Sequence, residues 1–101
     1  MTSIMEGRKL WASGEVAGSA TAVVLPSVPC VYVWIKAIAS NAGYVYLGVA
    51  GVTKVDGTTD TTSGLQIAPG EIVGPLHVDN LNRFYIICDN AGDDLTYLAG
   101  A

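Results

Sequence analysis

Residues 31–38 read VYVWIKAI and constrain the fold more than any other part of the sequence, because six of the eight are β-branched or aromatic. On an extended strand, the odd-numbered residues of this run face one way, and Tyr32, Trp34 and Lys36 face the other. Both sets are largely apolar. We therefore expect a central strand that is covered on both faces, and one of the two covers can come from a partner protein.

The rest of the chain after residue 20 also favours strands. Short apolar or alternating runs are separated by turn residues, as at Asn41–Gly43 and Pro69–Gly70. These runs cover residues 21–25, 44–48, 71–78, 83–88 and 95–98. Gly74 and Pro75 interrupt one of them, which predicts an edge strand or a bulge. The polar, Thr- and Gly-rich stretch 52–64 is expected to be a long loop or a weak hairpin.

These patterns predict an all-β fold, namely a single-domain β-sandwich or a jelly-roll-like barrel. Residues 1–19 lack a steady period and contain several glycines, so we expect an irregular N-terminal arm there and the β-sandwich domain over 20–101. Leu10 and Trp11 lie in the middle of this arm. The Trp11 ring is expected either to dock on a neighbouring subunit or to fold back onto the core of its own chain.

Two segments of the chain resemble each other. Residues 33–48 (VWIKAIASNAGYVYLG) and 83–100 (RFYIICDNAGDDLTYLAG) both place Asn-Ala-Gly between an apolar run and a run that contains Tyr and Leu. We interpret them as two similar hairpins, which suits a sandwich with approximate internal two-fold symmetry. Chance similarity between two β segments is the alternative.

The charge content points to a protein partner. Only 14% of the residues are charged, against about 25% in an ordinary domain, so part of the apolar surface is expected to meet another subunit. The alternative is a compact monomer with a weakly charged surface. The net charge is −4 and the five basic residues are scattered, which argues against binding to nucleic acid or to an anionic membrane. No apolar run approaches the roughly 18 residues of a spanning helix.

The sequence offers little for chemistry. The single histidine, His77, is expected at a surface or an interface, and the N-terminus has no secretory apolar region, so Cys30 and Cys88 are expected as buried thiols rather than a disulfide. The acidic stretch 89–94 is the best metal candidate, but it lacks the EF-hand spacing, and a solvated turn is the favoured interpretation. We expect no catalytic residue, no cofactor and no metal, and hence no enzyme.

A resemblance to a protein family adds to this interpretation. The order TAVVLPSVPC-VYVWIKA, then NAG-YVYLG, then GLQIAPGEIVGPLHVDNLNRFYI is similar to that of small virion proteins of tailed bacteriophages. In that family a Leu-Pro-Ser-x-x-Cys strand entry, an Asn-x-Gly turn and a Leu-x-x-Pro-Gly-Glu turn recur in this order. The match covers about residues 21–98, and its motifs specify a fold better than a function.

The resemblance implies a capsid decoration or cement protein, located in a virion that is assembled in the host cytoplasm. Its expected partners are the major capsid protein and further copies of itself, with a trimer favoured. The residues expected to make these contacts are Leu10, Trp11, Tyr32 and Trp34; for Tyr32 and Trp34 the alternative is a place in the protein's own core. The alternative function is a fibre or tail module that binds a host receptor or glycan through residues 53–64, Tyr44 and Tyr46.

Overall fold

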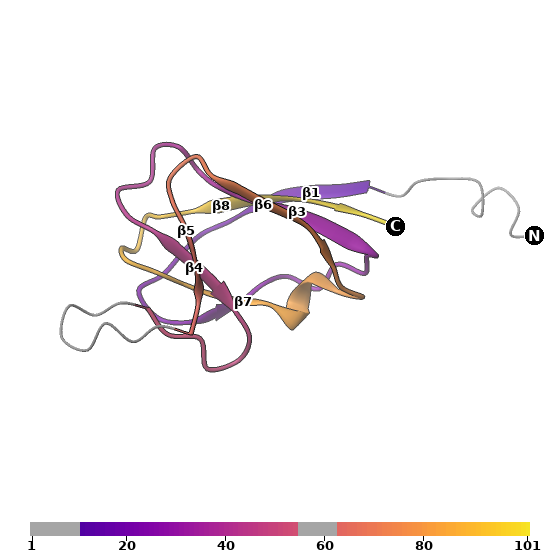
Figure 1. Cartoon of the computed structure of the whole chain (residues 1–101), viewed down its shortest axis with the longest axis horizontal. Helices are drawn as coiled ribbons and strands as arrows, with labels where there is room; N and C mark the ends of the chain where they lie inside the picture. The colour runs from indigo at the N-terminus through magenta and orange to yellow at the C-terminus, as the bar shows by residue number, and fades with distance from the viewer. Residues whose placement is uncertain (1–10, 55–62) are drawn as a thin grey trace, which may run out of the picture.

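The computed structural model describes residues 11–54 and 63–101, which form eight strands and one short 3-10 helix (Figure 1). In chain order these elements are β1 (Trp11–Val16), β2 (Val23–Val24), β3 (Tyr32–Ala37), β4 (Val45–Gly48), β5 (Leu65–Ile67), β6 (Ile72–His77), η1 (Leu81–Arg83), β7 (Tyr85–Cys88) and β8 (Leu95–Gly100). No helix in these two ranges is long and apolar enough to cross a membrane.

The strands form two antiparallel four-stranded sheets that face each other (Figure 1). Sheet I has the order β1-β8-β3-β6 and sheet II the order β2-β7-β4-β5. The pairs β1–β8, β2–β7, β3–β6 and β4–β5 are those of one long hairpin, and the additional pairs β3–β8 and β4–β7 roll this hairpin into two layers. This arrangement is an eight-stranded jelly roll. The predicted all-β sandwich is therefore confirmed.

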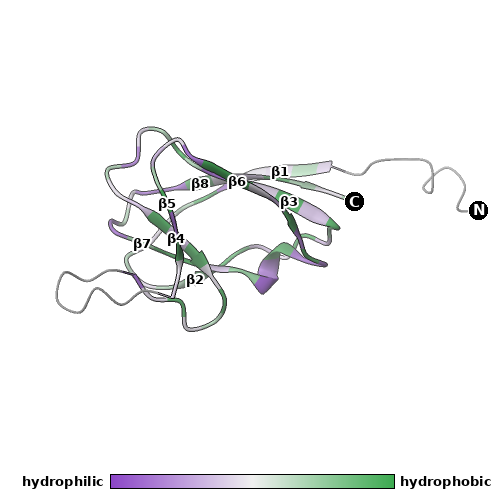
Figure 2. Ribbon diagram, in the orientation of Figure 1, coloured by the Kyte–Doolittle hydropathy of each residue, from purple (hydrophilic) through white to green (hydrophobic). Residues whose placement is uncertain are grey.

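The core lies between the two sheets. Val33, Ile35 and Ala37 of β3 are fully buried, as the alternation of residues 31–38 predicts, and they meet inward-facing side chains of sheet II such as Val45 and Ile86. The hydropathy of the residues agrees with this arrangement. Figure 2 shows hydrophobic residues along β3 and β4 and hydrophilic residues at η1. The side chains on the outer face of each sheet therefore lie outside this core.

The predicted irregular arm differs from the structure over Trp11–Val16, which forms β1 and pairs along its full length with β8. Its exposed and half-buried side chains alternate, but the inward positions hold small residues rather than large apolar ones. Gly14 is required there, because a Cβ at this position would lie 2.8 Å from the hydroxyl oxygen of Tyr97. The sequence did not predict this strand, because its inward and outward residues differ in side-chain size and do not show the usual alternation of apolar and polar residues. Residues 1–10, including Leu10, lie outside the described residues.

The two ends of the predicted loop 52–64 are joined by reciprocal hydrogen bonds. The Thr53 backbone N–H donates to Ser63 Oγ at 3.0 Å, and the Ser63 backbone N–H donates to Thr53 Oγ1 at 2.9 Å. Residues 55–62 between them lie outside the described residues. The short strand β5 begins just after this loop and was not predicted, because it contains only three residues.

The prediction of two similar hairpins is wrong. β3 and β4 lie in different sheets, and so do β7 and β8, so each Asn-Ala-Gly segment carries the chain from one sheet to the other. The two segments contact each other instead of closing hairpins: Asn41 Nδ2 donates to the Asp94 carbonyl at 2.8 Å, and the Asp94 N–H donates to Asn41 Oδ1 at 2.9 Å. The repeated motif therefore marks two connections that join at one end of the sandwich.

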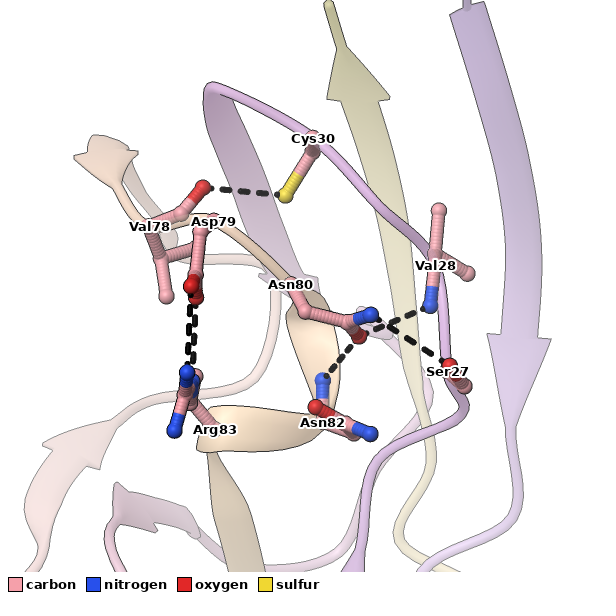
Figure 3. A network of polar contacts seen from close by, with 8 residues as sticks. All are labelled: Ser27, Val28, Cys30, Val78, Asp79, Asn80, Asn82 and Arg83. Atoms are coloured by element: carbon pink, nitrogen blue, oxygen red, sulfur yellow. Dashed lines mark hydrogen bonds and ion pairs between the residues drawn. The ribbon is translucent and has the colours of Figure 1, made fainter.

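A second polar network, around Asn80, fixes the approach to β3 (Figure 3). Asn80 Oδ1 accepts hydrogen bonds from the backbone N–H groups of Val28 and Asn82, each at 3.0 Å, while Asn80 Nδ2 donates to Ser27 Oγ. Beside it, Arg83 binds the Asp79 carboxylate with two hydrogen bonds of 3.0 Å. These contacts hold the segment before β3 against η1, which sets the position at which β3 enters sheet I.

Candidate functional site

The outer face of sheet I carries a group of large apolar side chains that are exposed or only partly buried. We call it the aromatic face, and it comprises the outward residues of three neighbouring strands. The strand register places these residues in three rows across β1, β8 and β3, which are Trp11–Gly100–Tyr32, Ser13–Leu98–Trp34 and Glu15–Thr96–Lys36. The inward neighbours on β3 are buried in the core, so the large side chains of these rows project away from it.

Three aromatic rings form one cluster on this face. The ring centroids of Trp11 and Tyr32 are 5.7 Å apart, and those of Tyr32 and Trp34 are 5.2 Å apart. Trp11 and Trp34 stack at 6.2 Å with an angle of 26° between their planes. These distances are those of favourable aromatic pairs. The rings therefore hold one another in place even though they lie at the surface.

Two glycines make room for these rings. A Cβ on Gly100 would meet the Tyr32 ring and would lie 3.0 Å from Trp11 Cζ3, so only glycine lets the two rings close over β8. On the other side, Gly74 of β6 has a φ of 129° and lies at the register shift opposite Trp34. A Cβ there would lie 3.2 Å from Trp34 Cδ1 and 2.7 Å from the Val33 carbonyl oxygen. The predicted bulge or edge strand at Gly74–Pro75 is thus confirmed, and β6 is both.

A hollow of about 420 Å³ lies beside the aromatic cluster, with Thr96, Tyr97 and Leu98 of β8 among its lining residues. Trp11, Trp34, Lys36 and Ile72 complete the lining. Three of these apolar side chains are strongly exposed: Trp11 at 50%, Leu98 at 43% and Ile72 at 58%. Exposed apolar side chains that gather around a hollow make this surface the candidate functional site.

Two charged residues border the aromatic face at one end. Glu15 and Lys36 are both exposed and lie in the same row, on either side of Thr96. They are two strands apart, which is roughly 10 Å, so they do not form an ion pair with each other. Among residues 11–54 and 63–101, the single ion pair joins Arg83 and Asp79, far from this row in the sequence. Glu15 and Lys36 therefore remain available to charges on another molecule.

The structure brings together three of the four residues that the sequence marked as contacts. Trp11, Tyr32 and Trp34 share one face, and Leu10 lies outside the described residues. The alternative interpretations placed these rings in the protein's own core, and they are wrong. Trp11 is half-exposed, and Tyr32 and Trp34 are only partly buried on the outer face. Leu98 and Ile72 were missed, because the strand order that places β8 and β6 beside β3 is not encoded in the alternation of any one strand.

Three candidates of the sequence remain, namely His77, which lies beside the aromatic cluster, and the two cysteines. His77 is exposed at the end of β6, opposite Tyr32 in the register. Cys30 and Cys88 are free and buried, as predicted. Burial raises the pKa of the Cys88 thiol to about 11, and burial together with the nearby Asp79 raises the pKa of the Cys30 thiol. Neither thiol has the lowered pKa of a reactive cysteine.

The acidic stretch 89–94 uses its carboxylates to hold backbone. Asp93 is 1% exposed, and its two oxygens accept hydrogen bonds from the N–H groups of Ala42, Gly43 and Asn90 and from the Asn90 side chain. Burial alone would raise the pKa of Asp93, but these hydrogen bonds outweigh it and hold the pKa below its ordinary value. In the described part of the chain, no group of three or more His, Cys, Asp or Glu residues is arranged to hold a metal ion.

The two tyrosines named for the glycan alternative are not equally accessible. Tyr44 is 42% exposed, but Tyr46 is buried at 2% because Val52 and Gly64, which flank the 53–63 loop, lie over β4. The expectation of an exposed Tyr46 is therefore wrong. The rings of the two residues meet edge to face at 6.1 Å, so the exposed Tyr44 stands alone at the surface rather than as part of a platform.

Comparisons with known proteins give little beyond the fold. No protein-family model matches the chain, and no curated protein matches it. Among solved structures, the chain is similar to one from a study of Bacillus endospore appendages, described there as a novel family of disulfide-linked pili. The identity is 15% and the TM-score 0.46, over 91% of this chain and 86% of the other. A likeness at this level carries no information about what this chain does.

Proposed function

We propose that this chain is a non-enzymatic structural protein that joins a larger protein assembly by packing the aromatic face against other subunits. The observation that carries the proposal is the cluster of Trp11, Tyr32 and Trp34 beside an open hollow on the outside of a well-packed sandwich. Trp and Tyr are the residue types that supply most binding energy at protein interfaces. Rings held in place by one another also lose little freedom on binding.

The chemistry of the hollow favours a protein partner over a sugar. A glycan needs several hydrogen-bonding groups around its hydroxyls, and the hollow offers only the side chains of Lys36 and Thr96 besides the aromatic ones. The receptor- and glycan-binding alternative also loses Tyr46, which is buried. An apolar protein surface matches the remaining lining residues better.

In its most specific form, the proposal is a capsid decoration or cement protein of a tailed bacteriophage, as the resemblance of residues 21–98 implies. The protein would bind the major capsid protein as a homo-oligomer on the surface of the virion, and that resemblance favours a trimer. A jelly roll with a low content of charged residues and an exposed aromatic face suits such a role, because both assembly and attachment then rest on apolar contacts.

Co-sedimentation with heads of the phage that encodes the chain tests this function. We expect the purified protein to sediment with these heads at a fixed number of copies per particle, and to raise the temperature at which the heads open. The variant Trp11→Ala is expected to weaken attachment while circular dichroism shows an unchanged fold. Absence of co-sedimentation at any protein concentration would remove the decoration function.

Tyr44→Ala is the matched control, since Tyr44 is an exposed aromatic residue immediately before β4 of the opposite sheet. It removes a ring of similar size without touching the aromatic face. If Tyr44→Ala weakens attachment as much as Trp11→Ala does, the aromatic face is not the surface that carries the contact.

A further inference from the structure

The three rows of the aromatic face share an unusual pattern about their middle strand, β8. On either side of Gly100 stand two aromatic rings, Trp11 and Tyr32; on either side of Thr96 stand two opposite charges, Glu15 and Lys36. On either side of Leu98 stand the small Ser13 and the large Trp34. Consider a two-fold axis that runs parallel to β8, above the outer face of the sheet. Rotation by 180° about it places a second copy face to face with the first. Each side chain on one side of β8 then lies opposite the side chain that stands on the other side of β8 in the second copy.

We propose that the aromatic face is a self-association surface, on which a second copy of this chain packs face to face around a two-fold axis that runs along β8. The proposal rests on the proposed function, and it assigns the aromatic face to the contact between copies, in a dimer rather than the trimer that the resemblance favours. Trp11→Ala then weakens head attachment by dissociating the oligomer that attaches. In this arrangement Trp11 lies over Tyr32 of the second copy, Ser13 leaves room for its Trp34, and the two Leu98 side chains meet on the axis. Sheets that pack face to face in this way lie about 10 Å apart with nearly aligned strands.

The charges select a second copy over an apolar partner. Lys36 lines the hollow, Glu15 lies in the same row, and neither has an ion-pair partner among residues 11–54 and 63–101. A partner that covered them without opposite charges would leave two uncompensated charges in the interface, which is costly. The two-fold axis along β8 brings Glu15 of each copy to Lys36 of the other, so the same rotation forms two ion pairs and leaves none of the four charges unpaired.

The same axis predicts the strength of the contact. With the axis along β8, the strands that overlap between the copies are β1, β8 and β3, which span roughly 14 Å across and roughly 20 Å along the strands. A contact of this size lies below the range of standard stable interfaces, among the weak and transient ones. The dimer is therefore expected to dissociate on dilution, and its mass must be measured over a series of protein concentrations.

Site-directed cross-linking tests the axis itself. Thr96 lies on β8 and hence near the axis, so two copies of Thr96→Cys are expected to join through a short bis-maleimide linker. Ser13→Cys is the matched control: it lies one row away on β1, faces Trp34 of the other copy, and is not expected to join to itself. The native cysteines are buried and do not compete. Self-linking of Ser13→Cys without that of Thr96→Cys would mean that no two-fold axis runs along β8, and would overturn the proposal.

Charge reversal tests the pairing across the axis. Lys36→Glu and Glu15→Lys, each alone, are expected to weaken the dimer about tenfold or more, because they place like charges together. The double variant Glu15→Lys with Lys36→Glu is expected to restore it, while Asp79→Lys, away from the face, leaves it unchanged. Sedimentation velocity gives the dissociation constants. A double variant as weak as the single ones overturns the pairing.

The native mass separates this inference from the proposed function. A concentration-dependent dimer supports the inference, and a monomer at all concentrations or a closed trimer overturns it. Head attachment is measured independently of mass. A trimer that still binds phage heads would therefore remove the two-fold axis and keep the decoration function, whereas a dimer that binds no heads would do the reverse.

Discussion

Asp93 Oδ1 accepts a hydrogen bond of 2.9 Å from the backbone N–H of Ala42, which lies 51 residues earlier in the chain. The contact joins the β3–β4 connection to the β7–β8 connection at one end of the jelly roll. Because the same carboxylate also accepts hydrogen bonds from Asn90, a single side chain both shapes its own connection and ties it to the other one. It is the one buried charged residue of the described chain.

Replacing this carboxylate is expected to lower stability. In Asp93→Asn, one oxygen becomes an amide that cannot accept a hydrogen bond, so buried N–H donors lose their partner. We expect a loss of about 1–3 kcal/mol in the free energy of unfolding, measured by urea denaturation. Asp79→Asn, in an exposed ion pair with Arg83, should change the free energy of unfolding far less, because solvent screens an exposed ion pair. Equal effects of the two changes would contradict the role assigned to Asp93.

The same residue predicts a pH dependence. Hydrogen bonds lower the pKa of Asp93 in the folded protein below its ordinary value of 3.8, so the folded state binds this proton less readily than the unfolded chain. The contribution of Asp93 is therefore complete above the ordinary pKa and is lost as the pH falls through the lower, folded value. The stability difference between wild type and Asp93→Asn should shrink on acidification below about pH 4, as urea midpoints will show. A difference that stays constant down to about pH 2 would exclude this linkage.

Gly100→Ala should disturb the aromatic face from within. The added Cβ would meet the Tyr32 ring and Trp11, and the rings would have to separate. We expect a loss of about 1–3 kcal/mol, together with a shift in tryptophan fluorescence. Gly92→Ala is the control, because nothing lies within 4 Å of its added Cβ. It should change stability by less than about 0.5 kcal/mol. Unchanged fluorescence in Gly100→Ala would show that the rings do not meet over β8.

The buried thiols should resist modification. The pKa of Cys88 is about 11 and that of Cys30 is also raised, so at pH 8 both remain protonated and inaccessible in the folded chain. We expect no reaction with a thiol reagent until the protein is unfolded, when both cysteines of the chain react. The variant Cys30→Ser isolates Cys88 in the same assay. Rapid labelling of the native protein would show that the interior opens far more often than its packing indicates.

Much of the fold could be read from local patterns. The run 31–38 contains β3, and its alternation correctly separated the buried Val33 and Ile35 from the outward Tyr32 and Trp34. The interruption at Gly74–Pro75 correctly marked a bulged edge strand. These features succeed because each depends on side chains or backbone constraints within a few residues, which periodicity records directly.

What the sequence did not predict depends on contacts between distant segments. β1 was expected as an irregular arm, because the residue that fits under Tyr97 is a glycine and not an apolar side chain. The two Asn-Ala-Gly segments were expected as hairpins, because the same turn residues serve within a sheet and between sheets. The aromatic face needed both the strand order and β1, so the proximity of Trp11 to Trp34 could not be foreseen although both rings had been singled out.

The bulge at Gly74 also limits how copies of this chain can add to one another. Head-to-tail extension of sheet I needs two edges that can pair, and β6 offers one that is broken by a register shift and by Pro75, which has no N–H to donate. Sheet II ends in strands of only two and three residues, β2 and β5. Endless growth by strand pairing is therefore disfavoured, whereas a face-to-face contact around the two-fold axis proposed above would close after two copies.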